Sequence, residues 1–259
     1  MHGNATLDVS TLYGFLLVLS RVAGAFVFVP IPGIKDAPQA ARVVLALALT
    51  VALYPSWPAV DFAASGFGRV TGLVLAEAAF GITVGLTVAF LAEALTFAAQ
   101  VVSMQAGFSY ASTVDPTTEA DSSVLAVFAQ LAAGLLFFAM GLDRQVLKII
   151  ARSLETSPPG SFRLSPAIAQ SVVRFGGEML SVGVRLALPI MALLILVDLS
   201  LALLGRLNAQ LQLLSMAFPA KMMTALALLA WMTAVFPQIY ASYAARMWGM
   251  LQEMVRAHG

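Results

Sequence analysis

The chain lacks cysteine and has very few histidines. Because none of its 259 residues is cysteine, disulfides, thiol catalysis and thiolate metal sites are excluded. Its two histidines, His2 and His258, stand near the two ends of the sequence, which argues against an imidazole-based catalytic or metal site. The formal net charge is +1 and no basic stripe stands out, so a nucleic-acid partner is not indicated. The sequence suggests no cofactor.

Charge is also scarce. Only 10% of the residues are charged and 60% are hydrophobic, with a mean hydropathy of +0.91, whereas soluble domains typically carry about 25% charged residues. The sequence therefore predicts an all-α integral membrane protein with room for about six spans of roughly 20 residues. The loops are too short for a separate soluble domain, so residues 1–259 are expected to form a single membrane-embedded domain. The first fifteen residues contain Asp8 but no basic residue, so the first apolar segment does not resemble a signal peptide and is expected to stay in the mature protein.

Apolar runs and their breaks divide the chain into segments of very different length. The second run is short for a span, whereas the third, if helical, would reach about 50 Å against a hydrocarbon core of about 30 Å. The third is therefore expected either to kink near its glycines or to leave the bilayer while packed against protein. A turn is expected at Pro158-Pro159-Gly160 and a hairpin link at 205–212. The six predicted apolar segments are 12–29, 42–53, 70–102, 124–142, 180–204 and 213–239.

The distribution of charge gives conflicting indications of topology. The positive-inside rule places basic residues 144–174 in the cytoplasm and acidic residues 106–122 on the opposite side. A six-span count then places Lys35 and Arg42 outside, against the same rule. Either the second segment does not span, or the protein is not a conventional bilayer bundle.

Lone charges in the apolar runs are the candidate functional residues, because a charge that is costly in lipid usually faces a partner, a cavity or a pore. Glu77 and Glu93 are 16 positions apart and so lie on nearly opposite faces of a helix, which favours assembly contacts over a shared ion site. Asp198 and Arg206 are eight positions apart and can reach one polar surface, and Lys221 beside Pro219 is interpreted as serving the same hairpin. The pair Gly81 and Gly85 permits close approach of a second helix. The charges expected to make assembly contacts are Arg21, Glu77, Glu93, Arg185, Asp198, Arg206 and Lys221.

A series of motifs extends over nearly the whole chain. An apolar segment containing Arg21 is followed by the turn Val29-Pro30-Ile31-Pro32-Gly33 and by Arg42 before the next apolar run. The middle carries Gln105-Ala-Gly107-Phe108-Ser109 and then Asp115-Pro116. The late link from Arg206 to Gln212 fits less well, because it has Ala209 in place of the usual proline. In order, spacing and total length these motifs resemble the flagellar biosynthetic protein FliR family, which includes subunit T of type III secretion injectisomes.

The resemblance implies a non-catalytic channel subunit of the flagellar type III export gate in the bacterial inner membrane, at the flagellar basal body. FliP-like and FliQ-like subunits would complete the gate. FlhB-like and FlhA-like proteins would join it, and unfolded substrates would pass through its centre. The resemblance also implies that the loop 106–122 forms a plug across the closed pore, whereas its polar composition alone also suits a solvated connection. The residues assigned to the plug are Gly107, Phe108, Ser109, Ser112, Asp115 and Pro116.

Two other functions remain open. The injectisome branch of the same family has a related role in virulence secretion. A small ion-coupled transporter would use Glu77, Glu93 and Arg185, but such proteins usually show inverted repeats, and no convincing internal repeat is found. An intramembrane enzyme has less support, since HExxH and Gly-x-Gly-Asp motifs are absent.

Overall fold

The predicted all-α class is confirmed. The computed structural model describes residues 9–29, 39–58, 67–108, 124–162, 166–207, 213–232 and 234–256, and these contain helices and their connections but no strand. A 3-10 helix, η1 (Tyr54–Ser56), follows the second α-helix. The α-helices of the described part are α1 (Val9–Phe28), α2 (Gln39–Ala52), α3 (Phe67–Ala106), α5 (Val124–Ala139), α6 (Leu142–Thr156), α7 (Pro166–Leu207), α8 (Leu213–Met232) and α9 (Phe236–Arg256).

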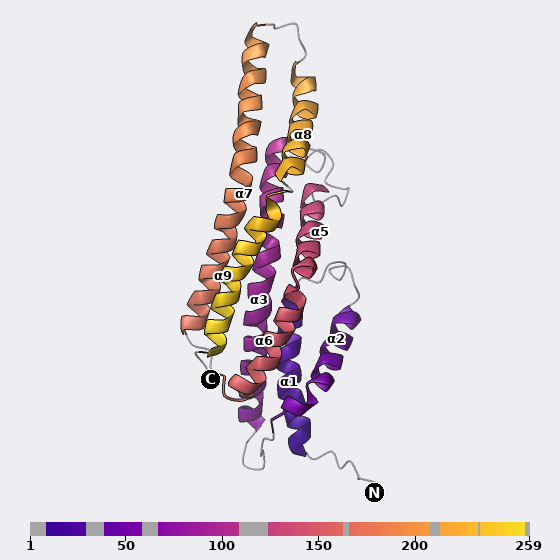
Figure 1. Cartoon of the computed structure of the whole chain (residues 1–259), viewed down its shortest axis with the longest axis vertical. Helices are drawn as coiled ribbons and strands as arrows, with labels where there is room; N and C mark the ends of the chain where they lie inside the picture. The colour runs from indigo at the N-terminus through magenta and orange to yellow at the C-terminus, as the bar shows by residue number, and fades with distance from the viewer. Residues whose placement is uncertain are drawn as a thin grey trace. The chain divides into compact units, whose positions relative to one another are not determined.

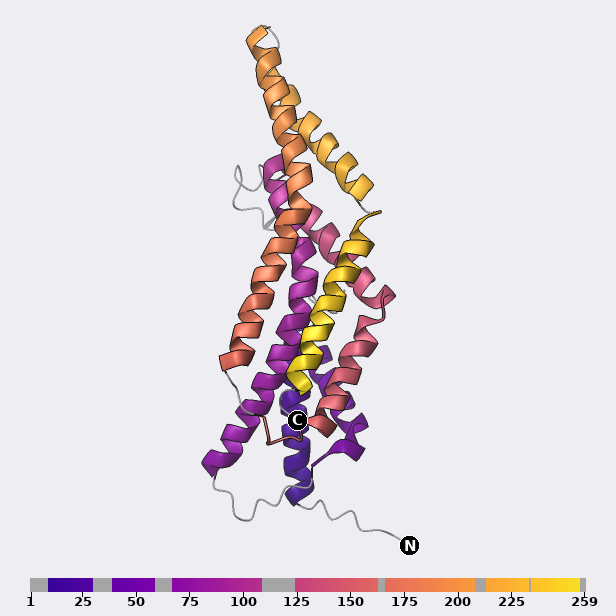
Figure 2. The same ribbon diagram turned by 60° about the vertical axis from the view of Figure 1, so that its left-hand side comes forward.

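The helices form two compact units. Unit one comprises Met1–Phe90, Phe137–Gly176 and Ala245–Gly259, and unit two comprises Leu91–Leu136 and Gly177–Ala244. Within unit one, α1 lies between α2 and the first half of α3 (Figures 1 and 2). Unit two contains the second half of α3, most of α5 and the α7–α8 hairpin.

The overlong third segment is a single helix. α3 contains 40 residues without interruption, a path of about 60 Å at 1.5 Å per residue. It covers the whole of the predicted segment and extends it at both ends. Its path is therefore about twice the hydrocarbon thickness of a bilayer.

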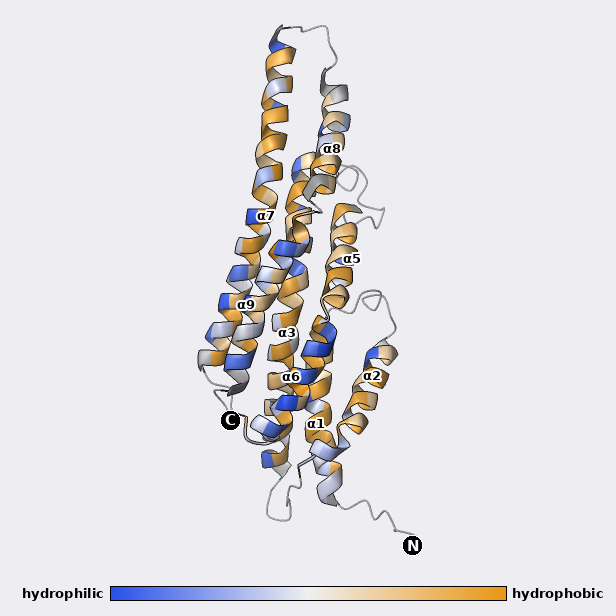
Figure 3. Ribbon diagram, viewed as in Figure 1, coloured by the Kyte–Doolittle hydropathy of each residue, from blue (hydrophilic) through white to orange (hydrophobic). Residues whose placement is uncertain are grey.

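The basic residues 144–174 lie in a region that is largely helical, and the structure also corrects the predicted end of the preceding segment. The segment expected to end at Leu142 breaks earlier, at Gly141, where a φ of +66° favours glycine. α5 and α6 are bent by 63° across this break. α6 forms because its apolar residues recur at helical spacing, and its polar residues lie on the remaining surface (Figure 3). The buried residues of α6 are Leu142, Val146, Ile149, Ile150, Ser153 and Leu154.

Proline positions explain two further differences from the predicted segments. α7 begins at Pro166 rather than near Leu180, and proline suits the first helical position because its missing N–H has no partner there. The last predicted segment, 213–239, is two helices. α8 ends at Met232 and α9 begins at Phe236, with Pro237 in its first turn, where a proline is tolerated.

Fewer helices qualify as membrane spans than the six apolar segments predicted. Three described helices are long and apolar enough to cross a membrane: Ser10–Phe28, Gly68–Ala106 and Ile168–Arg206. The bent pair α5–α6 makes a fourth if it counts as one span. α2, with 14 residues, is short for a span, as expected.

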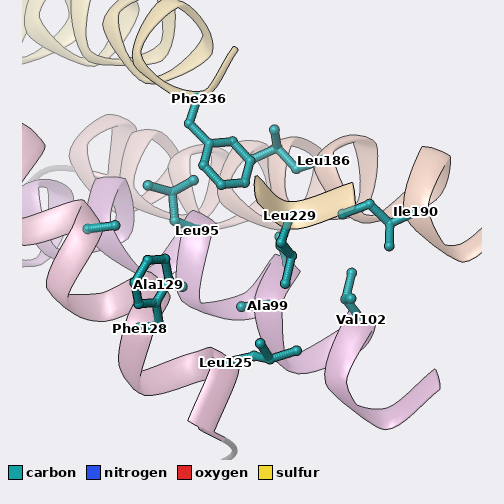
Figure 4. A pocket seen from close by; sticks show the side chains of 12 residues that line it. Leu95, Ala99, Val102, Leu125, Phe128, Ala129, Leu186, Ile190, Leu229 and Phe236 are labelled. Carbon is teal, nitrogen blue, oxygen red and sulfur yellow. The ribbon is translucent and has the colours of Figure 1, made fainter. Parts of the chain in front are cut away.

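The core of unit two encloses a small apolar cavity. Its volume is about 50 Å³, and apolar side chains from five helices point into it (Figure 4). A cavity with such a lining stays dry. Among the side chains that line it are Leu95, Phe128, Leu186, Ile190, Leu229 and Phe236.

Candidate functional site

Arg21 and Glu77 form a completely buried ion pair inside unit one. The two residues lie 56 positions apart, on α1 and α3, and both side chains are 0% exposed. Arg21 Nε donates to Glu77 Oε2 across 2.5 Å. The guanidinium also lies over the Phe80 ring, with Cζ 4.5 Å from the ring centroid, a cation–π arrangement. Two of the predicted lone charges therefore neutralise each other within the chain.

The same pair holds the end of α6 and the turn that follows it. Arg21 Nη1 donates to the Ser153 carbonyl at 2.9 Å, to Ser153 Oγ at 3.1 Å and to the Ser157 carbonyl at 3.0 Å. These carbonyls lie at the C-terminus of α6, where a helix favours a cation. Glu77 Oε1 accepts from the Gly160 N–H at 2.7 Å. We name these residues the Arg21 cluster: Arg21, Glu77, Ser153, Ser157 and Gly160.

Gly160 belongs to the turn expected at Pro158-Pro159-Gly160, and the structure confirms that turn. The Ser161 N–H donates to the Pro158 carbonyl at 3.0 Å, and Gly160 has a φ of +96°. Glycine is favoured at this φ because other side chains rarely adopt it. The turn thereby presents the Gly160 N–H to the buried carboxylate of Glu77.

Glycines bring α1 and α3 into contact beside the cluster. A Cβ at Gly81 would overlap the backbone carbonyl of Arg21, and a Cβ at Gly85 would overlap that of Ala25. On the opposing helix, a Cβ at Gly24 would meet the Ala78 carbonyl oxygen at 2.6 Å. The Gly81/Gly85 pair therefore lies where the backbones of α1 and α3 are in direct contact, as in a GxxxG contact.

A second polar cluster lies in unit two. Lys221 Nζ on α8 is 2.6 Å from Asp198 Oδ1 on α7, and Gln105 Nε2 on α3 donates to Asp198 Oδ2 at 3.4 Å. The structure thus gives Asp198 a different partner from Arg206, which is exposed in the last turn of α7. Lys221 thus joins α8 to α7 within the hairpin in which the sequence analysis placed it. This trio, the Asp198 cluster, connects three helices of unit two.

Removing the cation of the Asp198 cluster should destabilise the hairpin. We expect Lys221→Met to lower the free energy of unfolding by about 2 kcal/mol, because Asp198 lies in a candidate span and loses its charged partner. The double variant Lys221→Met/Asp198→Asn should cost less than the sum of the two single changes. Thermal unfolding of the detergent-solubilised protein measures both effects. A coupling free energy between Asp198 and Arg206, with none between Asp198 and Lys221, would contradict this pairing.

The start of the predicted plug loop is fixed by a helix cap. Gly107 follows the last residue of α3 and has a φ of +87°. The Gly107 N–H donates to the Met104 carbonyl at 3.3 Å, and the Phe108 N–H donates to the Ser103 carbonyl at 3.0 Å. This is the Schellman arrangement that glycine favours. Gln105, two residues before the cap, belongs to the Asp198 cluster. The remaining residues assigned to the plug lie outside the described residues: Ser109, Ser112, Asp115 and Pro116.

The other predicted charges occupy different environments. Glu93 is half-buried on α3, and Arg185 is exposed on α7. Among the described residues, no group of three or more histidine, cysteine, aspartate or glutamate side chains could hold a metal ion. Ser153 and Ser157, which bind the Arg21 guanidinium, were not among the predicted site residues. The regular spacing of apolar residues along α6 was the signal that could have placed them at a helix terminus.

Comparison with known proteins gives matches over most of the chain. The family model described as "Bacterial export proteins, family 1" matches residues 12–247. The flagellar biosynthetic protein FliR of Caulobacter vibrioides is 30% identical over 233 residues, which cover 88% of this chain and 91% of that protein. FliR of Escherichia coli K12 is 26% identical over 212 residues, covering 82% and 81% of the two chains. Both clusters described above fall within the family match.

Proposed function

This chain belongs to the family of bacterial export proteins that includes FliR, and we propose that it is the FliR subunit of a flagellar type III export gate. The observation that carries the proposal is the match to a flagellar FliR at 30% identity over 91% of that protein's length. Proteins of this family are non-catalytic components of the export apparatus. With its candidate membrane spans, this FliR homologue is an inner-membrane protein of the basal body.

In the proposed gate, FliP-like and FliQ-like subunits join this chain around a channel for unfolded flagellar proteins. FlhB-like and FlhA-like proteins associate with it. In each candidate span, no more than 44% of the most apolar window is buried within the chain, which leaves surface for such neighbours or for lipid. α7 is the most exposed of the three, since only 22% of its most apolar window is buried within the chain.

The Arg21 cluster weighs against the ion-coupled transporter. Both carboxylate oxygens of Glu77 are occupied, one by Arg21 and one by the Gly160 N–H. A coupling carboxylate must exchange its ion or proton during transport, whereas this one is completely buried and holds three segments together. The geometry therefore favours a structural role for Glu77.

Gene deletion tests the flagellar assignment. An in-frame deletion in the source bacterium should abolish motility and remove flagellar filament protein from the culture medium, and a plasmid copy should restore both. Secretion of virulence proteins should be unaffected. Normal motility together with lost virulence secretion would assign the chain to an injectisome instead.

We propose that the loop after Gly107 is the plug of the closed channel. The Schellman cap and the hydrogen bond from Gln105 to Asp198 support this proposal, because the cap orders the chain as it leaves α3 and the hydrogen bond joins the last turn of α3 to α7.

Deleting residues 109–118 should leave the gate assembled but raise passive leakage of ions across the membrane, because nothing would then obstruct the channel. Ion efflux from cells expressing the variant measures this. A glycine–serine segment of the same length serves as the control, and it should leak as well, because it keeps the connection but loses the packing side chains. Unchanged leakage at normal complex levels would show that the loop is only a connector.

A further inference from the structure

A cleft between α6 and the C-terminal part of α9 lies within unit one, and none of its lining residues belongs to the Arg21 cluster or the Asp198 cluster. Its volume is about 200 Å³, more than ten times the 10–15 Å³ that one water molecule requires. The buried side chain of Ile149 is part of its wall. The polar lining comes from Gln145, Lys148, Arg152 and Thr156 of α6 and from Trp248 and Gln252 of α9.

The cleft is positively charged. Lys148 and Arg152 are one helical turn apart and both are exposed. Neither makes an ion pair with a carboxylate in the described part of the chain. The acidic residues of these two helices, Asp143, Glu155 and Glu253, are not part of the lining. Two cations therefore share one concave surface, and no carboxylate among the described residues neutralises them.

The other lining residues suit a ligand that is polar at one end and apolar at the other. Gln145 and Gln252 add amide groups that can donate hydrogen bonds to an anion. The Thr156 hydroxyl donates to the Arg152 carbonyl at 3.0 Å, so that proton is engaged within the helix. Trp248 is half-buried and, with Ile149, gives the cleft an apolar side. Tryptophan is enriched where membrane proteins meet the lipid headgroups.

We propose that this cleft binds the phosphate headgroup of an anionic phospholipid, such as phosphatidylglycerol. Lysine and arginine together recognise a phosphodiester through charge-assisted hydrogen bonds. Basic pockets between membrane helices are typical headgroup sites. A lipid is favoured over a soluble anion because the chain is a membrane protein and because Trp248 and Ile149 offer apolar surface to the glycerol and upper acyl groups.

Lipid binding by native mass spectrometry tests the proposal. The full-length chain, extracted in mild detergent with its co-purifying subunits, is stripped of lipid and titrated with phosphatidylglycerol or phosphatidylcholine. We expect the wild type to prefer phosphatidylglycerol, and Lys148→Gln/Arg152→Gln to bind it at least about tenfold more weakly, since each basic residue contributes on the order of 1 kcal/mol. The matched control is Arg144→Gln/Arg246→Gln, which removes two exposed charges from the same helices outside the cleft and should bind as the wild type does.

Three further measurements separate the lipid from other ligands and from misfolding. The swap Lys148→Arg/Arg152→Lys keeps both charges and should retain binding, which distinguishes loss of charge from loss of fold. Inorganic phosphate at millimolar concentration should fail to displace the lipid, whereas full displacement would indicate a soluble-anion site and overturn the proposal. Equal affinity for the two lipids, or equal weakening in the Arg144/Arg246 control, would overturn it as well.

A photo-crosslinker at Gln145 should capture lipid in membranes, and capture of a protein alone would overturn the proposal by showing that a partner occupies the cleft.

Discussion

Arg21→Met should lower the free energy of unfolding by about 3–5 kcal/mol, because it leaves the Glu77 carboxylate completely buried without its cation. The change also removes the side-chain donor to the Ser157 carbonyl and one of the two donors to the Ser153 carbonyl, which still accepts from the Ser157 N–H. We therefore expect lower levels of the protein in membranes and a lower thermal unfolding temperature in detergent. Quantitative blotting of membranes and thermal unfolding of the purified protein measure the two effects.

A double variant distinguishes the ion pair from general packing. Arg21→Met/Glu77→Leu replaces both charges with apolar groups and should cost less than the sum of its single variants, because neither leaves a lone buried charge. The double variant should still be less stable than the wild type, since the Gly160 N–H loses its acceptor. Arg42→Met is the matched arginine control. The Arg42 side chain is more exposed and donates to the Val27 carbonyl at 3.1 Å, so its loss should have a smaller effect. Strict additivity of the two cluster changes would contradict the pairing.

Gly81→Val should also be strongly destabilising, by about 3 kcal/mol, the upper part of the range for overpacking. The new Cβ would overlap the backbone carbonyl of Arg21, and a backbone atom cannot yield as a flexible side chain can. α1 and α3 would separate, and the buried ion pair between them would be weakened. The thermal unfolding temperature and the protein level in membranes should both fall.

Gly72→Ala is the matched control on the same helix. A Cβ at Gly72 meets nothing within 4 Å. Alanine is favoured over glycine inside a helix by up to about 1 kcal/mol, so this substitution should be neutral or stabilising. A Gly81→Val variant as stable as the Gly72→Ala variant would show that α1 and α3 do not need close contact.

The sequence predicted what depends on local composition and spacing. The long apolar runs predicted the all-α class, the Gly81/Gly85 spacing indicated a face for close helix approach, and the Pro158-Pro159-Gly160 run predicted its turn. The positions of lone charges identified Arg21 and Glu77 as residues that needed partners. Each of these features can be recognised within a short window of sequence.

The partners themselves could not be predicted, because they are far apart along the chain. Arg21 and Glu77 are separated by 56 positions and lie on different helices, so neither charge identifies the other. α6 was not predicted as a helix because its charged residues made 144–174 a polar region, although its apolar residues recur at helical spacing. Asp198 was assigned to Arg206 by proximity in sequence, whereas the α7–α8 hairpin brings Lys221 beside it.

The structure also revises the reason for expecting assembly. At the sequence level, the lone charges were interpreted as contacts with other subunits. Arg21, Glu77, Asp198 and Lys221 instead find partners within the chain. What supports assembly is the apolar surface left exposed on long helices such as α7, together with membership of the export family.

The most direct test of the account is the composition of the complex that contains this chain. The chain, tagged at its own chromosomal locus and extracted in a mild detergent, should purify with FliP-like and FliQ-like proteins in a defined complex, as identified by mass spectrometry. Lys148→Gln/Arg152→Gln should not change that composition, because the cleft is proposed to hold lipid rather than a subunit. A stable, monodisperse monomer with intact helical structure, purified without any export protein, would contradict the proposal that this chain is a gate subunit.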